Sequence, residues 1–513
     1  MTHLNNSVAV KESGMTQPQP RTLLQHLLET TPGLNCTTWA RFQVLWGRMA
    51  SEAAQGLGLP KLAHVRVSRS SYQRWLSGAH VTKGDTAVIL EWYFGKSAAE
   101  LARPVPRREI VRPSPLGPST LTAATRALDY TWNTSRYVPG EPNTGVIGTW
   151  ELSGGRHFDG TAIGLQLYEA APDGDQVELK EADLPHLQSY VRSSRRGVVL
   201  ASLCTAGETG LYLLDAAHAR RQLTTGQVPR IPAAYQLDDL TFSLTRALYV
   251  LDDGMLADDL PLSDRAEELG YYVKTGDSAP PRSDMPELSP VGAAWLGSTL
   301  CAQYITRRLD ELPAIPVFWT REATGEECAP WLLFRHKHEY LQAVASRFAG
   351  AASPLGRAFC VPEQAVHSTE PHERILLLLT VAMMEMHRIT VWITNDPAYT
   401  QTEGFVLAQN RAILANWVRE DSSVWRVATT SAAQDVAPYR EAIAHAQAHS
   451  IVDAPTPAAR LQALAEYLEL DWTWLVARCR ALGESGITGM LRPRSRHLTL
   501  TALDQTLRFL GAM

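Results

Sequence analysis

The sequence of 513 residues lacks several patterns that would identify an enzyme, a secreted protein or a membrane protein. Its six cysteines are widely spaced and form no CxxC pair, which favours buried thiols in a reducing compartment over a disulfide framework. The first 20 residues contain no apolar core of a signal peptide, and no apolar run reaches the ~20 residues that a membrane-spanning helix needs. Neither the GxSxG motif of hydrolases nor the HExxH motif of metalloproteases occurs. These absences predict a cytoplasmic protein that does not contact a membrane, is not an enzyme, and holds no metal or cofactor.

Charge is distributed unevenly along the chain. The whole chain carries a net charge of −5, and its 45% hydrophobic and 20% charged residues are typical of a globular protein. Residues 21–112 contain 13 Lys and Arg against 6 Asp and Glu, whereas residues 113–513 contain 34 against 46. A basic module joined to an acidic body suits a protein in which one domain meets a polyanion. Charge also fluctuates between segments by chance, so the pattern favours a polyanion without requiring one.

Chain length and breaks in composition predict a multidomain α+β protein. One domain per ~150 residues suggests about three domains. Five prolines between residues 104 and 120 forbid a continuous helix and indicate a linker, whose Arg107, Arg108 and Arg112 could add phosphate contacts or simply be solvated. The predicted segments are a disordered tail (1–20), an all-α helix-turn-helix domain (21–103), the linker (104–120), a mixed α/β domain (121–280), an α/β domain for ligand binding or dimerisation (281–450) and a C-terminal helical segment (451–513).

The body of the chain combines strand and helix patterns. Short apolar runs bounded by glycine predict strands at 160–170, 197–207 and 210–217, with a helix at 182–194. Residues 233–256 predict a helix with one leucine-rich face. Beyond residue 290, runs such as RITVWITNDP alternate with amphipathic runs such as FRHKHEYLQAVASRF and QNRAILANWVRE, which predicts largely parallel strands between helices. The run ILLLLTVAMM fits a buried strand or a buried helix equally well.

The basic segment has the pattern of a helix-turn-helix. Apolar side chains at helical spacing predict a first helix at 39–56, which ends at a glycine-rich break. A short helix from Lys61 leads to a turn, and Ser68 then offers an N-cap for a second helix that Gly78 ends. The inward side chains of that second helix, at positions i, i+3 and i+4, are Tyr72, Trp75 and Leu76.

The opposite face of this second helix carries the chemistry that major-groove recognition requires. Its outward residues are Arg69, Ser70, Gln73 and Arg74. Because Arg pairs with guanine and Gln with adenine, we expect Arg69, Gln73 and Arg74 to contact bases or their adjoining phosphates. The predicted contacts to the DNA backbone, which would position the module, are Ser68, Ser70, Lys61 and Arg66. A helical hairpin with a solvated basic face is the alternative.

The order VSRSSYQRWLSG, followed by a helix ending in FGKSAAELA, resembles the bacterial lambda-repressor-like (Xre/Cro-type) helix-turn-helix regulators. The resemblance covers about residues 35–103 and departs from a minimal module in its longer first helix and loop. Later runs, among them IPAAYQLDDLTFSLTRALYVLDD and EGFVLAQNRAILANWV, resemble the long C-terminal extension of large regulators from high-GC bacteria. Together the two resemblances imply a transcriptional regulator with a sensory or assembly body and no particular ligand.

Three other clusters have simpler structural explanations. Gly95-Lys96-Ser97 is like the end of a phosphate-binding loop, but a helix stop followed by the capping box Ser97-x-x-Glu100 explains it. The cysteines and histidines between residues 328 and 372 lack the tight spacing of zinc ligands. The acidic cluster could bind a cation or a basic partner, although solvated helix ends explain it better; its members are Asp252, Asp253, Asp258 and Asp259.

Two further features leave alternatives open. Five tryptophans could line a ligand pocket or fill an ordinary core: Trp319, Trp331, Trp392, Trp417 and Trp425. The basic run RPRSRH, with Arg492, Arg494, Arg496 and His497, could touch DNA, contact a second subunit or be a solvated turn.

We therefore expect a transcriptional regulator that binds double-stranded DNA sequence-specifically. A homodimer would place two recognition helices about 34 Å apart, one helical turn of DNA. The acidic body would dimerise and could bind a small-molecule effector or a protein partner. One alternative is an enzyme with its chemistry between residues 290 and 430, which converging polar side chains in a pocket would favour. Another is a protein-interaction scaffold, which a large dry apolar patch would favour.

Overall fold

The computed structural model describes residues 22–30, 39–103, 128, 135–139, 148–193, 197–205, 208–281, 288–351, 353–420 and 423–513. The chain divides into two compact units, Met1–Ile110 (unit 1) and Val111–Met513 (unit 2). The predicted tail (1–20) and linker (104–120) lie outside the described residues. The protein combines helices with two β-sheets and ends in a helical segment, as the sequence predicts.

Helices make up the described part of unit 1. They are α1 (Leu23–Thr30), α2 (Trp39–Leu57), the 3-10 turn η1 (Pro60–His64), α3 (Arg69–Leu76), α4 (Asp85–Phe94) and α5 (Ala98–Leu101). Glycines follow α2, α3 and α4: Gly58, Gly78 and Gly95 have φ of +64°, +71° and +61°. Glycine adopts this left-handed backbone readily, so each ends its helix at the place that the sequence indicates.

Aromatic side chains form the core of unit 1. The rings of Phe42 and Tyr72 stack with centroids 4.1 Å apart, and those of Trp46 and Trp75 lie 5.9 Å apart. These pairs join α2 to α3. The indole Nε1 of Trp46 also donates to the carbonyl of Val65 at 2.8 Å, which fixes the turn before α3. Since truncating a buried aromatic costs roughly 3–5 kcal/mol, α2 holds α3 firmly in place.

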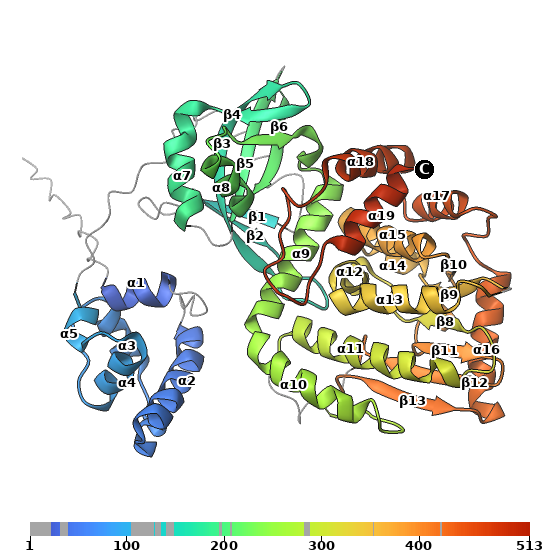
Figure 1. Ribbon diagram of the computed structural model, residues 1–513, viewed down its shortest axis with the longest axis horizontal. Helices are drawn as coiled ribbons and strands as arrows, with labels where there is room; N and C mark the ends of the chain where they lie inside the picture. The colour runs from blue at the N-terminus through green and yellow to red at the C-terminus, as the bar shows by residue number, and fades with distance from the viewer. Residues whose placement is uncertain are drawn as a thin grey trace, which may run out of the picture. The chain divides into compact units, whose positions relative to one another are not determined.

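The first sheet of unit 2 has seven strands. They are β1 (Ser135–Pro139), β2 (Gly148–Leu152), β3 (Thr161–Asp173), β4 (Gln176–Leu179), β5 (Gly197–Thr205), β6 (Glu208–Asp215) and β7 (Arg230–Pro232). The path β1-β2-β3-β4-β7 is antiparallel, whereas β5 pairs parallel with β3 and antiparallel with β6. Helices α7 (Leu184–Ser193) and α8 (Ala216–Thr224) accompany this sheet (Figure 1). The predicted strands β3, β5 and β6 and helix α7 are confirmed, whereas β1 and β2 contain no apolar run long enough to predict them.

The second sheet has six strands in the order β10-β9-β8-β11-β12-β13. They are β8 (Val317–Thr320), β9 (Leu355–Cys360), β10 (Ile389–Thr394), β11 (Phe405–Ala408), β12 (Arg411–Asn416) and β13 (Arg426–Thr430). Strands β8, β9 and β10 are parallel, but the pairs β8–β11, β11–β12 and β12–β13 are antiparallel. The prediction of a largely parallel sheet is therefore wrong for strands β11, β12 and β13, which pair antiparallel.

The run QNRAILANWVRE forms strand β12, so the prediction of a helix there is also wrong. A two-residue turn at Gln409-Asn410 joins β11 to β12 in an antiparallel hairpin. Helices cover both faces of this sheet, so Ala412, Ile413 and Leu414 are all buried. A strand buried on both faces shows no alternation in its sequence, so the run lacks the pattern that distinguishes a strand from a helix.

Helix α16 (Ala433–Ala448) packs on one face of the second sheet, against Trp319, Phe405 and Leu414. Helices α11 (Pro290–Arg308) and α15 (Pro371–Met386) pack on the other face, and α13 (Arg335–Arg347) lies beside α11 (Figure 1). The run ILLLLTVAMM belongs to α15, which settles it as a buried helix rather than a strand.

Helix α9 (Asp239–Ala257) contacts the first sheet on one side and α11, α12 (Gly325–Leu333) and α15 on others (Figure 1). The predicted helix and its leucine-rich face are confirmed, and most of the other side chains of α9 are buried as well. The remaining helices are α10 (Asp259–Tyr272), α14 (Glu363–His367), α17 (Pro457–Tyr467), α18 (Trp472–Ser485) and α19 (Thr501–Gly511). The last three confirm the predicted C-terminal helical segment. Throughout the described ranges, no helix is both long and apolar enough to cross a membrane.

Candidate functional site

The first candidate site is the α3 surface, which consists of Arg69, Ser70, Gln73 and Arg74. Ser68 precedes α3 with an extended backbone, and its hydroxyl accepts the backbone N–H of Ser71 at 3.1 Å. This cap sets where the helix begins. Tyr72 and Trp75, each 5% exposed, then face the core. The four residues of the α3 surface are exposed, so the inner and outer faces match the sequence prediction.

The other predicted DNA contacts lie near the α3 surface in the chain. Lys61 and Arg66 are exposed, and the Nζ of Lys61 lies 3.0 Å from a carboxylate oxygen of Asp85. An exposed ion pair contributes about 0–1 kcal/mol, so a phosphate could displace Asp85 at little cost. The hydroxyl of Ser68 is already engaged in capping α3 and lies 3.0 Å from that of Ser70. Ser68 therefore acts first as a helix cap.

We expect the substitution Ser68→Ala to lower the free energy of unfolding of unit 1 by about 1 kcal/mol, because the N–H of Ser71 loses its acceptor. Urea unfolding followed by tryptophan fluorescence measures the loss. Ser51→Ala, an exposed serine inside α2, makes the same chemical change away from a cap and should leave stability within about 0.5 kcal/mol. Equal losses of stability in the two variants would show that the Ser68 hydroxyl does not stabilise α3 as a cap.

The run Gly95-Lys96-Ser97 is a helix stop followed by a helix start, as predicted. Gly95 ends α4 in the left-handed conformation, and Ser97 caps α5. The N–H of Ser97 donates to Glu100 Oε2 at 2.9 Å, and the N–H of Glu100 donates to Ser97 Oγ at 3.3 Å. These reciprocal bonds form the predicted capping box.

Two of the four clustered aspartates are buried, so their prediction as solvated helix ends is wrong. Oδ1 of Asp252 accepts the backbone N–H groups of Arg494 and Ser495 at 2.9 and 2.8 Å. Asp258 accepts the N–H of Ser289 at 2.9 Å, and desolvation raises the pKa of Asp258 above its usual value. Asp252 thus anchors the basic run RPRSRH to α9 through the backbone of the run, while the side chain of Arg496 stays exposed.

The cysteines and histidines of unit 2 are dispersed. Among the described residues, no group of three or more His, Cys, Asp and Glu side chains is placed to hold a metal ion. Burial raises the pKa of the Cys360 and Cys479 thiols to about 12 and lowers the pKa of His372 to about 3. These groups are therefore neutral at physiological pH.

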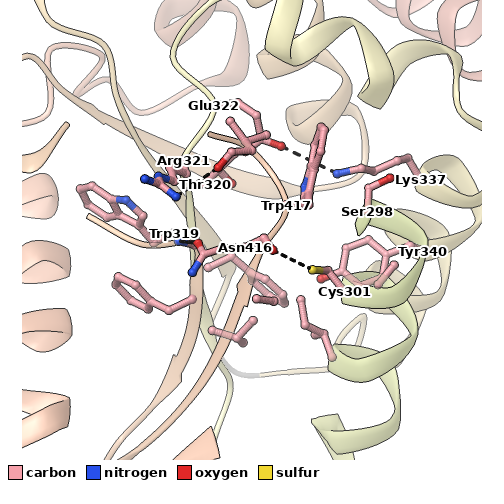
Figure 2. Close-up of a pocket in the computed structure, with 18 of the residues that line it drawn as sticks. Ser298, Cys301, Trp319, Thr320, Arg321, Glu322, Lys337, Tyr340, Asn416 and Trp417 are labelled. Carbon is pink, nitrogen blue, oxygen red and sulfur yellow. Dashed lines mark hydrogen bonds and ion pairs between the residues drawn. The ribbon is translucent and has the colours of Figure 1, made fainter. Parts of the chain in front are cut away.

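A second candidate site is a cavity of about 50 Å³ in unit 2, which we call the tryptophan cavity. Elements that contribute to its lining are α11, α12 and α13 and strands β8, β9, β11 and β12. Trp319, Trp331 and Trp417 line it, and Figure 2 shows two of them beside Asn416. Trp392 and Trp425 lie outside the cavity, and Trp425 is fully buried in the core. Three of the five tryptophans thus line a cavity, and two of these, Trp319 and Trp331, also belong to the buried core, as Trp425 does.

Three buried charged side chains line this cavity, and none was predicted. Lys337 from α13, Arg357 from β9 and Glu322, which follows β8, are each 3% exposed. The Nζ of Lys337 lies 3.8 Å from Oε1 of Glu322 (Figure 2). It also lies 3.5 Å from the ring centre of Trp331. The same Glu322 oxygen accepts the indole N–H of Trp331 at 2.8 Å. One sequence signal was available: Lys337, Tyr340, Leu341 and Val344 share helical spacing and place the lysine on the apolar face.

The electrostatics of the tryptophan cavity follow from its burial. Desolvation lowers the pKa of Lys337 to about 8, although nearby Glu322 opposes the shift. Desolvation also lowers the pKa of the Arg357 guanidinium, which remains charged at neutral pH. Arg321 is paired with Glu420 at 3.1 Å. Glu322 is within ion-pair distance of Lys337 and also acts electrostatically on Arg357, so one carboxylate faces two cations and an excess of one positive charge remains.

Comparisons of the chain with protein-family models, curated proteins and solved structures found no match.

Proposed function

We propose that the protein is a sequence-specific DNA-binding transcriptional regulator of the lambda-repressor-like (Xre/Cro-type) helix-turn-helix kind. The observation that carries the proposal is the α3 surface: a capped helix that buries Tyr72 and Trp75 and exposes two arginines, a glutamine and a serine. The basic charge of residues 21–112 supports it, because DNA binding depends largely on neutralising phosphates.

The dimensions of α3 suit the major groove. A helix of eight residues is ~12 Å long, and the groove is ~12 Å wide. Arg69 and Gln73 are one turn apart on the same side of the helix, about 6 Å along its axis. That separation spans roughly two base-pair steps, so the two side chains address base pairs about two positions apart. Arg74, Arg66 and Lys61 would then contact the flanking phosphates.

A homodimer completes the proposal. One α3 surface contacts only a few base pairs, and two copies about 34 Å apart would contact two half-sites on the same side of the duplex. We assign dimerisation to the acidic unit 2, whose net negative charge keeps it away from the DNA.

Selection of duplexes from a random library by the intact chain tests this function. We expect enrichment of a motif with two half-sites about ten base pairs apart, centre to centre. The same selection with the variant Arg69→Ala/Gln73→Ala should enrich no motif. If the unaltered chain enriches no sequence above a protein-free control, the protein is not a sequence-specific DNA-binding protein.

A second candidate function is an enzyme that acts in the tryptophan cavity, where buried polar groups converge. Nucleophilic or acid–base catalysis requires a reactive group within hydrogen-bond reach of its base. The hydroxyl of Thr320 instead accepts from Arg357 Nη1 at 2.6 Å. The thiol of Cys301, whose pKa burial raises, lies 3.6 Å from the carbonyl oxygen of Asn416. Neither of these two groups faces a base, but the hydroxyl of Ser298, a third lining residue, lies 2.9 Å from Nε2 of His336. That hydroxyl donates to the carbonyl of Trp295 at 3.1 Å, and desolvation lowers the pKa of His336 well below its usual value, so the histidine is a weak base and the geometry favours binding over catalysis.

A further inference from the structure

We propose that the tryptophan cavity binds a small organic carboxylate with a single negative charge and a short apolar chain. Three independent properties of the cavity lead to this ligand: its unmet hydrogen-bonding groups, its charge and its size. The inference rests on unit 2 alone and does not depend on DNA binding by unit 1.

The unmet hydrogen-bonding groups of the lining are all donors. Within the described part of the chain, the buried polar atoms of lining residues without a hydrogen-bond partner are Arg321 Nε, Arg357 Nε and Nη2, and Asn416 Nδ2. Leaving a buried donor unpaired costs about 1–3 kcal/mol, so these residues favour a ligand that only accepts hydrogen bonds. A carboxylate does so with two oxygens, which suits the fork of a guanidinium.

The net charge of the side chains that line the cavity favours a ligand with one negative charge. Lys337 and Arg357 share only Glu322, and all three side chains are withdrawn from water. The Lys337 ammonium lies over two indole rings, 3.5 Å from the centre of Trp331 and 4.3 Å from that of Trp417. These rings lower the free-energy cost of burying the ammonium, but they carry no net charge and leave its positive charge unbalanced. A monoanion would balance the cavity, whereas a dianion would overcompensate and a cation would be repelled.

Size and wall chemistry narrow the class further. A water molecule needs about 10–15 Å³ of such space, so a cavity of about 50 Å³ holds roughly four groups of that size. Around that space Figure 2 shows Trp319, Trp417 and Tyr340, whose rings provide apolar contact, and Asn416, which provides the donor. The fitting ligand is therefore a carboxylate of two to about four carbons rather than a sugar or a nucleotide.

Calorimetric titration of the intact chain with sodium butyrate at constant ionic strength tests the proposal. We expect one butyrate per chain, and at least about tenfold weaker binding of butyramide, which has the same size but no charge. Acetate and propionate extend the series to smaller members. No binding of any of the three carboxylates would overturn the proposal, and equal affinity for butyramide would overturn its charge argument.

The substitution Asn416→Asp separates ligand binding from folding. Oδ1 of Asn416 accepts the N–H of Gly404, and an aspartate keeps that acceptor while it replaces the unpaired donor with an anion. We expect butyrate affinity to fall at least about tenfold and the melting temperature to be kept or raised, since the new carboxylate balances the buried cations. Asn395→Asp makes the same change outside the cavity and should leave affinity unaltered. Unchanged butyrate binding in Asn416→Asp would show that butyrate does not bind in the tryptophan cavity. The comparison with butyramide uses the unaltered chain, so it tests the proposal even if this variant misfolds.

Butyrate affinity is also expected to fall as the pH rises through about 8, where Lys337 loses its proton. Lys337 has titratable and charged neighbours on each packed element: Glu322 after β8, Arg357 of β9, Cys301 of α11, Cys328 of α12 and His336 of α13. Desolvation depresses the pKa of the lysine, so the ammonium is present below about pH 8 and is lost above it. Titrations between about pH 6.5 and 9 should show affinity falling by up to about tenfold per pH unit at the alkaline end. A profile that stays flat to pH 9 would show that Lys337 does not contribute its charge to the ligand.

Discussion

The variant Arg69→Ala/Gln73→Ala is expected to lose sequence-specific DNA binding while remaining folded. Each bidentate contact between a side chain and a base contributes about 1–3 kcal/mol of discrimination. Loss of two such contacts should therefore weaken binding to a selected duplex by roughly 30-fold to 10⁴-fold. Both side chains are exposed, so their removal leaves the core contacts of Tyr72 and Trp75 in place. Fluorescence anisotropy measures the affinity, and circular dichroism confirms the fold.

Helix α2 offers a matched control for this variant. Arg48 and Gln55 are exposed on α2, so Arg48→Ala/Gln55→Ala removes the same residue types and the same charge from unit 1. We expect this control to keep the preference for the selected duplex and to lose only a small, sequence-independent part of the affinity. If the two double variants lose the same affinity, general charge rather than the α3 surface accounts for binding.

The second large effect is expected from Glu326→Ala, which should destabilise unit 2 by about 2–4 kcal/mol. Glu326 lies in the first turn of α12 and is buried, and its two oxygens accept the backbone N–H groups of Arg156 and Phe158 at 2.8 and 2.7 Å. Alanine would leave both N–H groups without their acceptor. It would also remove an anion close to the buried guanidinium of Arg246. Gly155 permits this approach, because a Cβ there would lie 2.2 Å from Glu326 Oε1.

Urea unfolding followed by near-ultraviolet circular dichroism measures that destabilisation. Glu326→Gln keeps one acceptor oxygen and should lose less stability than Glu326→Ala. Glu339→Ala, at an exposed glutamate on α13, should change the free energy of unfolding by no more than about 0.5 kcal/mol. A loss in Glu326→Ala as small as that of the control would show that the link between residues 156–158 and α12 contributes little.

The elements of unit 1 from α2 to α5 are predictable from the sequence because their signals are local. Ser68, Gly78 and the capping box of Ser97 and Glu100 act on backbone groups within four residues of themselves. The division of α3 into a buried and an exposed face follows from its own period of 3.6 residues. No long-range contact is needed to deduce any of these features.

The features of unit 2 that were missed depend on contacts between distant segments. Glu326 and Phe158 are 168 positions apart, and the pairing of Asp252 with Ser495 spans 243. The tryptophan cavity joins Glu322, Lys337 and Arg357 from separate elements, and nothing in the spacing of those three residues indicates that they meet. Strand β12 cannot be distinguished from a helix by its sequence, because both faces of its sheet are covered and the alternation that marks a strand is absent.

The central proposal, that the chain discriminates between DNA sequences, is tested most directly by one anisotropy experiment. The intact chain is titrated with the selected duplex and with a permuted duplex of the same composition, at about 0.15 M salt. The account predicts an affinity for the selected duplex at least about 10³-fold higher. Equal affinities for the two duplexes would contradict it.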